Sequence, residues 1–93
     1  MVTVRLMGVL RQAAGTDRIE VPTGVDSDVN AVVQWLTENY VGLRETLVDR
    51  VVGSPIPNAL ILVDGVEVSN LQGERTPVRQ GSTVVFLSVT HGG

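Results

Sequence analysis

The sequence predicts an α+β domain, with one main helix packed on one face of a mixed sheet. Segments at both ends of the chain alternate apolar and polar residues with period two, and a segment between them has apolar residues at helical spacing. Of the 93 residues 43% are hydrophobic, with 19 Val and only three aromatic residues. Small β-branched side chains pack well on a pleated sheet, and this length fits a single domain.

Two strands are predicted before the helix. The first begins at Val2 and, from its alternation, continues to about Val9. Residues 13–17, Ala-Ala-Gly-Thr-Asp, indicate a turn. The run Arg18–Val21 alternates again, and Pro22 ends it. Together these segments predict a hairpin with a long loop.

The main helix follows where the spacing of apolar residues changes from every second residue to helical spacing. Its apolar face is formed by Val29, Val32, Val33, Leu36 and Tyr40. Residues 26–28, Asp-Ser-Asp, all offer side chains that can cap its first turn, and the sequence does not choose between them. Gly42 is expected to break the helix, and a short second helical piece is expected from Leu43 to about Val48.

The second half of the chain predicts a loop, a hairpin and a last strand. Two closely spaced prolines indicate the loop, and Asp64-Gly65 is a strong signal for a tight hairpin turn. The expected segments are loop 53–57, strand 58–63, return strand 66–68, a turn or single helical turn over 69–73, a turn over 79–81 and strand 82–89.

The predicted order is therefore β-β-α-(short helix)-β-β-β. The economical arrangement places the first and last strands side by side and parallel, with the helix across one face, which is the β-grasp fold of ubiquitin-like proteins. We expect residues 1–89 to form this domain and residues 90–93 to form a flexible tail that ends in Gly92-Gly93.

Composition argues against several classes of protein. No apolar run approaches the length of a transmembrane helix, and no charged leader precedes an apolar segment, so we expect neither a membrane span nor a signal peptide. The absence of Cys removes disulfides, thiolate nucleophiles and Cys-based zinc sites, and fits a cytoplasmic location. A net charge of −3 without a basic cluster disfavours nucleic-acid binding.

No enzymatic constellation is visible. The single histidine, His91, sits in the tail without an orienting partner, and the carboxylates are explained as helix caps, turn residues or solvated surface. We therefore expect no catalytic side chain, no bound metal and no bound cofactor. All seven basic residues are Arg, which either reflects codon usage or keeps ε-amines away from a reactive acyl group.

Two features remain that suggest a function. If Val84 and Phe86 point to the helix, then Val85, Leu87 and Val89 form an apolar stripe on the other face, which indicates a partner site unless segment 41–57 folds back over it. The Gly92-Gly93 end carries no Cβ, so it is either a frayed end or a narrow tail that threads a channel and presents its carboxylate to the α-phosphate of ATP.

With these features in place, the sequence resembles the MoaD/ThiS ubiquitin-like sulfur carriers, which include the archaeal small modifier proteins and the ubiquitin-related modifier. The resemblance covers nearly the whole chain and is carried by residues 4–15, 38–40, 42–47, 60–68, 76–78 and Gly81. The tail departs from the commonest MoaD-like ending, because His91-Gly92-Gly93 looks like the end of the eukaryotic ubiquitin-related modifier.

The resemblance implies a carrier without catalytic activity of its own. A partner related to ubiquitin-activating enzymes would consume ATP to adenylate Gly93, and a persulfide protein would supply the sulfur of a C-terminal thiocarboxylate. MoaD-like members insert this tail into the large subunit of molybdopterin synthase. Other members serve thiamine thiazole synthesis, tRNA thiolation, cysteine synthesis or attachment to lysine-bearing targets.

The family pattern also implies where partners bind. It places the partner surface at Val85, Phe86, Leu87 and Val89, with His91 beside the reactive Gly92-Gly93 end. The most direct expectation is the MoaD-like small subunit of molybdopterin synthase. A protein modifier attached through Gly93, or a non-catalytic β-grasp binding module, are the alternatives.

Overall fold

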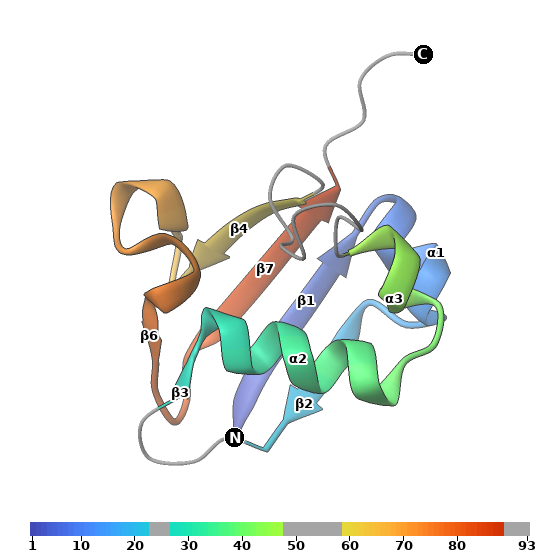
Figure 1. Cartoon of the computed structure of the whole chain (residues 1–93), viewed down its shortest axis with the longest axis horizontal. Helices are drawn as coiled ribbons and strands as arrows, with labels where there is room; N and C mark the ends of the chain where they lie inside the picture. Colours follow the sequence, from blue (N-terminus) through green and yellow to red (C-terminus); the bar gives the residue numbers. More distant parts are fainter. Residues whose placement is uncertain (23–26, 48–58, 89–93) are drawn as a thin grey trace.

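The first and last strands lie side by side and parallel at the centre of a five-stranded sheet (Figure 1). The computed structural model describes residues 1–22, 27–47 and 59–88. Within them the strand order is β2-β1-β7-β4-β5. The strands are β1 (Val2–Met7), β2 (Arg18–Val21), β4 (Ala59–Val63), β5 (Val66–Glu67) and β7 (Thr83–Ser88). The β-grasp arrangement predicted from element order is confirmed.

The connection between β1 and β2 differs from the prediction. The strand ends at Met7 rather than near Val9, and a helix, α1 (Val9–Ala14), replaces the expected long loop. Gly8, with φ of 64°, ends the extended backbone, and Gly15, with φ of 79°, ends the helix in a left-handed conformation. The helix is held to the core by Leu10, which is fully buried.

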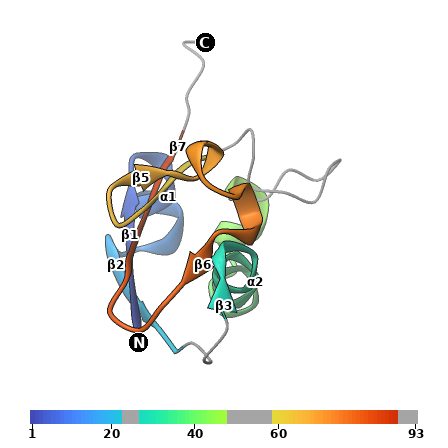
Figure 2. The ribbon, with the colours of Figure 1, turned by 90° about the vertical axis from the view of Figure 1, so that its left-hand side faces the viewer.

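The main helix, α2 (Val29–Asn39), lies across one face of the sheet (Figure 2). Four of the five residues of the predicted apolar face are buried, namely Val29, Val32, Val33 and Leu36, whereas Tyr40 is the C-cap and is half-buried. Asp28 is the N-cap, because its Oδ1 accepts a hydrogen bond of 2.8 Å from the Ala31 amide. The short helix α3 (Leu43–Thr46) matches the predicted second helical piece, whose expected end at Val48 lies outside the described residues.

The Asp64-Gly65 turn joins β4 to β5 as predicted. Its φ angles are 49° and 87°, the left-handed pair that a two-residue hairpin turn requires. Two 3₁₀ turns follow, η1 (Val68–Asn70) and η2 (Gly73–Arg75). A second, two-stranded sheet of β3 (Ser27–Asp28) and β6 (Pro77–Val78) was not predicted, since each strand is only two residues long. The predicted loop 53–57 and Asn58 lie outside the described residues.

The core lies between the five-stranded sheet and α2. Aliphatic side chains fill it around a single buried aromatic residue, Phe86, with no exposed surface. Both central strands supply it from alternate positions, namely Val2, Val4 and Leu6 of β1 and Val84 and Phe86 of β7. The opposite face of the sheet takes no part in this core. None of the helices in the described ranges is long and apolar enough to cross a bilayer.

Replacing Gly42 with Ala is expected to destabilise the fold by about 1–3 kcal/mol. A Cβ at this position would lie 2.0 Å from the carbonyl oxygen of Ala13, so the backbone of α1 or of the turn before α3 must move. The unfolding free energy from urea denaturation measures the loss. Val41→Ala is the control, because Val41 is 74% exposed and its truncation should change stability little. Equal stability of the two variants would contradict this packing.

Candidate functional site

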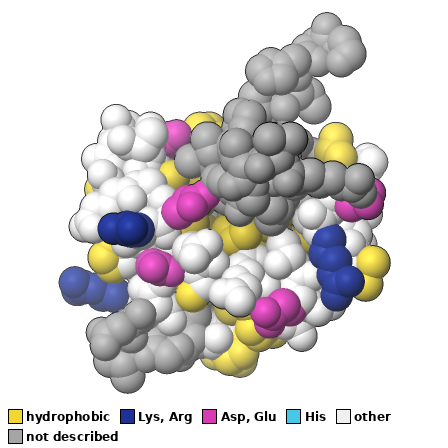
Figure 3. Space-filling model, viewed as in Figure 1, with side chains coloured by type: hydrophobic (Ala, Val, Ile, Leu, Met, Phe, Trp, Pro, Cys, Tyr) yellow, Lys and Arg dark blue, Asp and Glu magenta, His cyan; other side chains and the backbone are white. Residues whose placement is uncertain are grey.

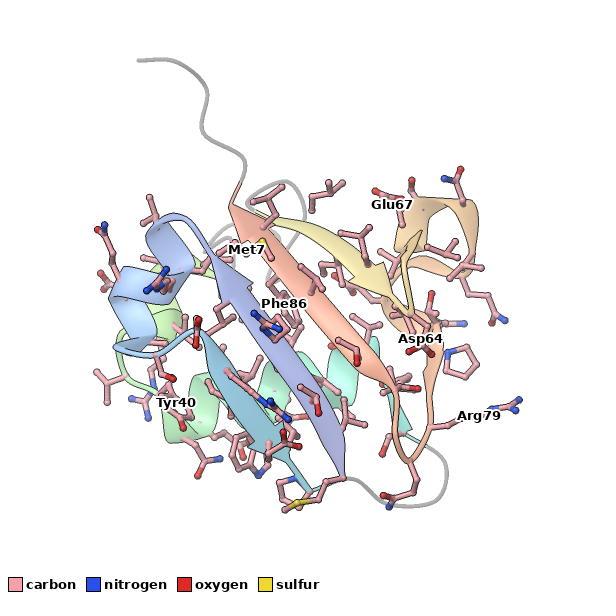
Figure 4. All side chains as sticks on the ribbon, turned by 180° about the vertical axis from the view of Figure 1, so that it is seen from behind. Met7, Tyr40, Asp64, Glu67, Arg79 and Phe86 are labelled. Atoms are coloured by element: carbon pink, nitrogen blue, oxygen red, sulfur yellow. The ribbon has the colours of Figure 1, made fainter. Side chains whose placement is uncertain are left out.

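The face of the sheet turned away from α2 is the candidate site (Figure 4). No helix of the described part of the chain lies over it in that view. Residues 41–47, which might have covered it, instead place α3 against α1 and α2; residues 48–58 lie outside the described residues. None of the described helices therefore covers the open face.

Alternation along β7 separates core from surface. Val84 and Phe86 are fully buried, Val85 is half-buried, and Leu87 is 38% exposed on the open face. The family-based assignment of Phe86 to the partner surface is wrong, because its side chain fills the core between the sheet and α2. In a strand with period two, a residue between two outward-facing neighbours must point inward.

The strand register groups five apolar residues on the open face. Leu87 pairs with Met7 of β1 on one side and with Leu60 of β4 on the other, while Val85 pairs with Leu62. Directly paired residues project on the same face at contact distance. We call Met7, Leu60, Leu62, Val85 and Leu87 the apolar stripe. Met7 is 42% exposed, and the stripe occupies the end of the sheet where β7 finishes at Ser88.

Charged residues border the apolar stripe on the β1–β2 side. Arg5 pairs in register with Val85 on β7 and with Arg18 on β2. The Arg18 Nε lies 3.1 Å from Glu20 Oε1, and the Thr3 hydroxyl donates to the same carboxylate at 3.1 Å. At the β5 side, the Glu67 carboxylate accepts hydrogen bonds from the amide and hydroxyl of Ser69. The stripe thus has a basic and an acidic border.

The sheet edges offer little for strand addition. The Thr16 hydroxyl accepts from the Arg18 amide at 3.3 Å and donates to the Arg18 carbonyl at 3.1 Å. The Leu6 amide donates to the Asp17 carbonyl, so by alternation the amides and carbonyls of Arg18 and Glu20 point away from β1, and Thr16 occupies those of Arg18. The other edge, β5, is only two residues long. A partner is therefore expected on the open face rather than along an edge.

The helix side of the domain carries charges of both signs. Basic and acidic side chains are interspersed over the part of it drawn in colour in Figure 3, without a large field of one sign. Among the described residues, no group of three or more His, Asp and Glu side chains is placed to hold a metal ion.

The predicted tail residues fall beyond this site. Val89, His91, Gly92 and Gly93 lie outside the described residues, so their roles stay predictions. Sequence reasoning found Val85 and Leu87 from alternation but missed Met7, Leu60 and Leu62. The signal was present, since pairing the two alternating end strands in parallel puts Met7 next to Leu87.

The topology defines the class of protein. A mixed sheet with parallel central first and last strands, crossed on one face by one main helix, is the ubiquitin-like β-grasp fold. A model of the ThiS family matches residues 4–93, and the chain belongs to that family.

Solved structures agree with this assignment. The chain is 30% identical to Urm1 from Trypanosoma brucei, with a TM-score of 0.80 over 99% of this chain and 94% of that one. It is 26% identical to the small archaeal modifier protein 1 (SAMP1) from Methanosarcina acetivorans, with a TM-score of 0.84 over 99% and 95%. The BexX/CysO complex from Amycolatopsis orientalis matches at 21% identity and a TM-score of 0.81, covering both chains fully (100% each), which shows the fold. A search of curated proteins found no match.

Proposed function

We propose that this protein is a ubiquitin-like sulfur carrier whose reactive group is the C-terminal carboxylate of Gly93. The observation that carries the proposal is the ThiS-family match over residues 4–93, on a β-grasp domain whose last strand leads into Gly92-Gly93. Members of this family are small carriers and modifiers. The protein would act as a cosubstrate, not as an enzyme.

The proposed chemistry has three steps, which begin on the adenylating enzyme. A carboxylate oxygen of Gly93 attacks the α-phosphorus of ATP, and pyrophosphate leaves. The terminal sulfur of a persulfide protein then attacks the acyl carbon, and AMP leaves. A second thiol cleaves the resulting S–S bond and frees the thiocarboxylate. The carrier supplies a narrow, Cβ-free end and a docking surface, while the adenylating enzyme supplies the catalytic groups.

The apolar stripe is the proposed docking surface for these partners. It is the exposed apolar group nearest to the point where β7 ends at Ser88, five residues before Gly93. A partner seated there would hold the end of β7 while the tail enters its active site. The Thr16 hydroxyl occupies the outward amide and carbonyl of Arg18, and the β5 edge is two residues long, which favours docking on the face over strand addition.

We further propose which pathway receives the sulfur. The expected pathway is molybdenum cofactor synthesis, with this chain as the MoaD-like small subunit of molybdopterin synthase. The second candidate is a protein modifier attached through Gly93, with or without tRNA thiolation, favoured by the 26% identity to a small archaeal modifier protein. Either role fits a cytoplasmic location.

Intact-mass measurement tests the carrier role. The protein is incubated with a candidate adenylating enzyme, ATP and a persulfide source. The expected product is heavier by the exchange of one oxygen for sulfur, and fragmentation places the change on Gly93. No change, with adenylating enzymes shown to be active on their own carriers, would favour the non-catalytic binding module.

Peptide mapping separates the modifier role from sulfur transfer. The chain has no Lys, so it offers no ε-amine for conjugation to itself, and each isopeptide-linked adduct must lie on another protein. Its last basic residue is Arg79, so trypsin would leave residues 80–93 on a target lysine rather than a Gly-Gly remnant. Finding this branched peptide in cells would establish conjugation, and its absence would favour a pure carrier.

Leu87→Asp is expected to lower kcat/KM for adenylation by about tenfold or more, because it places a charge in the centre of the apolar stripe. Leu87→Asp should also lose about 1 kcal/mol or more of unfolding free energy, so this variant and its control are assayed at a temperature where each is fully folded. Pyrophosphate exchange with the adenylating enzyme measures the effect. Leu71→Asp is the matched control, since Leu71 is 46% exposed and lies outside the stripe. Equal activity of the two variants would contradict docking on this surface.

A further inference from the structure

Arg5 occupies a distinctive position on the open face. Its strand neighbours are Val85 of the apolar stripe on one side and Arg18 on the other. Like charges directly opposite on neighbouring strands repel each other and destabilise a sheet. The domain therefore carries an unfavourable pair of cations at the border of the apolar stripe.

Only one of these two cations is compensated. Arg18 forms an ion pair with Glu20 at 3.1 Å, and Thr3 holds the same carboxylate from β1. Arg5 forms no ion pair with any residue in the ranges 1–22, 27–47 and 59–88, and its side chain is exposed. Among the described residues, the guanidinium of Arg5 therefore has no acceptor, and it lies next to the surface on which a partner is expected.

One row of paired side chains across the sheet has opposite charges at its two ends. It runs from Arg5 through Val85 and Leu62 to Glu67, with a cation at one end and a carboxylate at the other. The Glu67 carboxylate keeps its charge but accepts two hydrogen bonds from Ser69, so the end of the row with uncommitted donors is Arg5. The chain as a whole has a net charge of −3, so a basic border is a local exception that fixes the orientation of an acidic partner.

We propose that Arg5 is a specificity-determining residue that selects the adenylating enzyme. The occupant of the open face is then an enzyme surface with an apolar projection over Val85 and Leu62 and a carboxylate against Arg5. Arg18 and Glu20 extend this border, but their charges already satisfy each other. This inference rests on the proposed function, since it names the chemistry of the partner in the activation step.

Charge reversal tests the inference. Arg5→Glu should lower kcat/KM for adenylation by about tenfold, whereas the control Arg79→Glu should change it less than about twofold. Arg79 carries the same charge but lies in the turn leading into β7, away from the stripe (Figure 4). Arg5→Gln should give an intermediate loss. Raising the salt concentration from about 0.1 M to about 1 M shortens the Debye length from about 10 Å to about 3 Å and should narrow the difference between wild type and Arg5→Glu.

Thermal unfolding separates recognition from stability. Arg5→Glu removes the repulsion and places a carboxylate opposite Arg18, so its melting temperature should equal or exceed that of the wild type. Activity lost at unchanged stability, and restored by replacing a carboxylate on the enzyme's docking surface with Arg, would support the inference. If the wild type is adenylated and Arg5→Glu behaves like Arg79→Glu, Arg5 has no such role, while the proposed function stands. If the wild type is not adenylated, the proposed function fails first.

Discussion

Deleting Gly93 is expected to abolish adenylation and thiocarboxylate formation while leaving the fold intact. The reacting carboxylate would move to Gly92 and retreat by about 3.3–3.6 Å, one residue of extended chain. A displacement of 1 Å from the productive position already costs about a hundredfold in rate, so a whole residue should leave activity below detection. The described core extends from Val2 to Phe86, so the free energy of unfolding should not change.

Two further variants make this test specific. Adding one residue after Gly93 should be as harmful as the deletion, because the carboxylate overshoots the α-phosphate by the same length. Gly93→Ala keeps the length and adds one methyl group. Its loss of activity should be smaller than that of the deletion, and it arises because a narrow enzyme channel leaves little room for the methyl group. Pyrophosphate exchange and intact mass report adenylation and sulfur transfer separately. A shortened chain that still acquired sulfur would overturn the role of Gly93.

Most of the fold follows from the periodicity of the sequence, because the long elements bury one face each. The α2 helix has four buried residues at helical spacing, and β1 and β7 alternate strictly. The short elements could not be predicted in this way. In α1 only Leu10 is fully buried, with Ala13 and Ala14 partly packed against the core, so the helical spacing extends over a single turn and is a weak signal. Its boundaries are set by Gly8 and Gly15, whose positive φ angles the sequence does not reveal.

The candidate site was predictable only in part for a related reason. Alternation within β7 was enough to place Val85 and Leu87 on the open face. The apolar stripe also draws on β1 and β4, so its extent depends on the register of both pairings. The error on Phe86 came from preferring the family pattern over the alternation of the strand. Where the two disagree, the period-two rule of the sheet decides which side of the layer a side chain occupies.

Phe86→Ala is expected to cost about 3–5 kcal/mol of unfolding free energy, the largest stability effect of any variant considered. Its ring has no exposed surface and is the only buried aromatic side chain among the described residues, so truncation leaves a cavity between the sheet and α2. A domain of this size has a total stability of about 5–15 kcal/mol, so the variant should be close to unfolding at physiological temperature. Urea denaturation at low temperature keeps the folded baseline measurable.

The neighbouring residue provides the control, since Leu87→Ala should cost only about 1 kcal/mol. Leu87 is on the same strand and is also truncated to Ala, which removes three carbon atoms against six for Phe86, but it faces the open side. The two variants should also differ in activity, with the larger loss now expected for Leu87→Ala. Leu87→Ala should weaken docking at nearly full stability, while Phe86→Ala, assayed where it is still folded, should keep a normal KM because its ring does not reach the partner surface. Similar losses of stability from both variants would contradict the assignment of the two faces of β7.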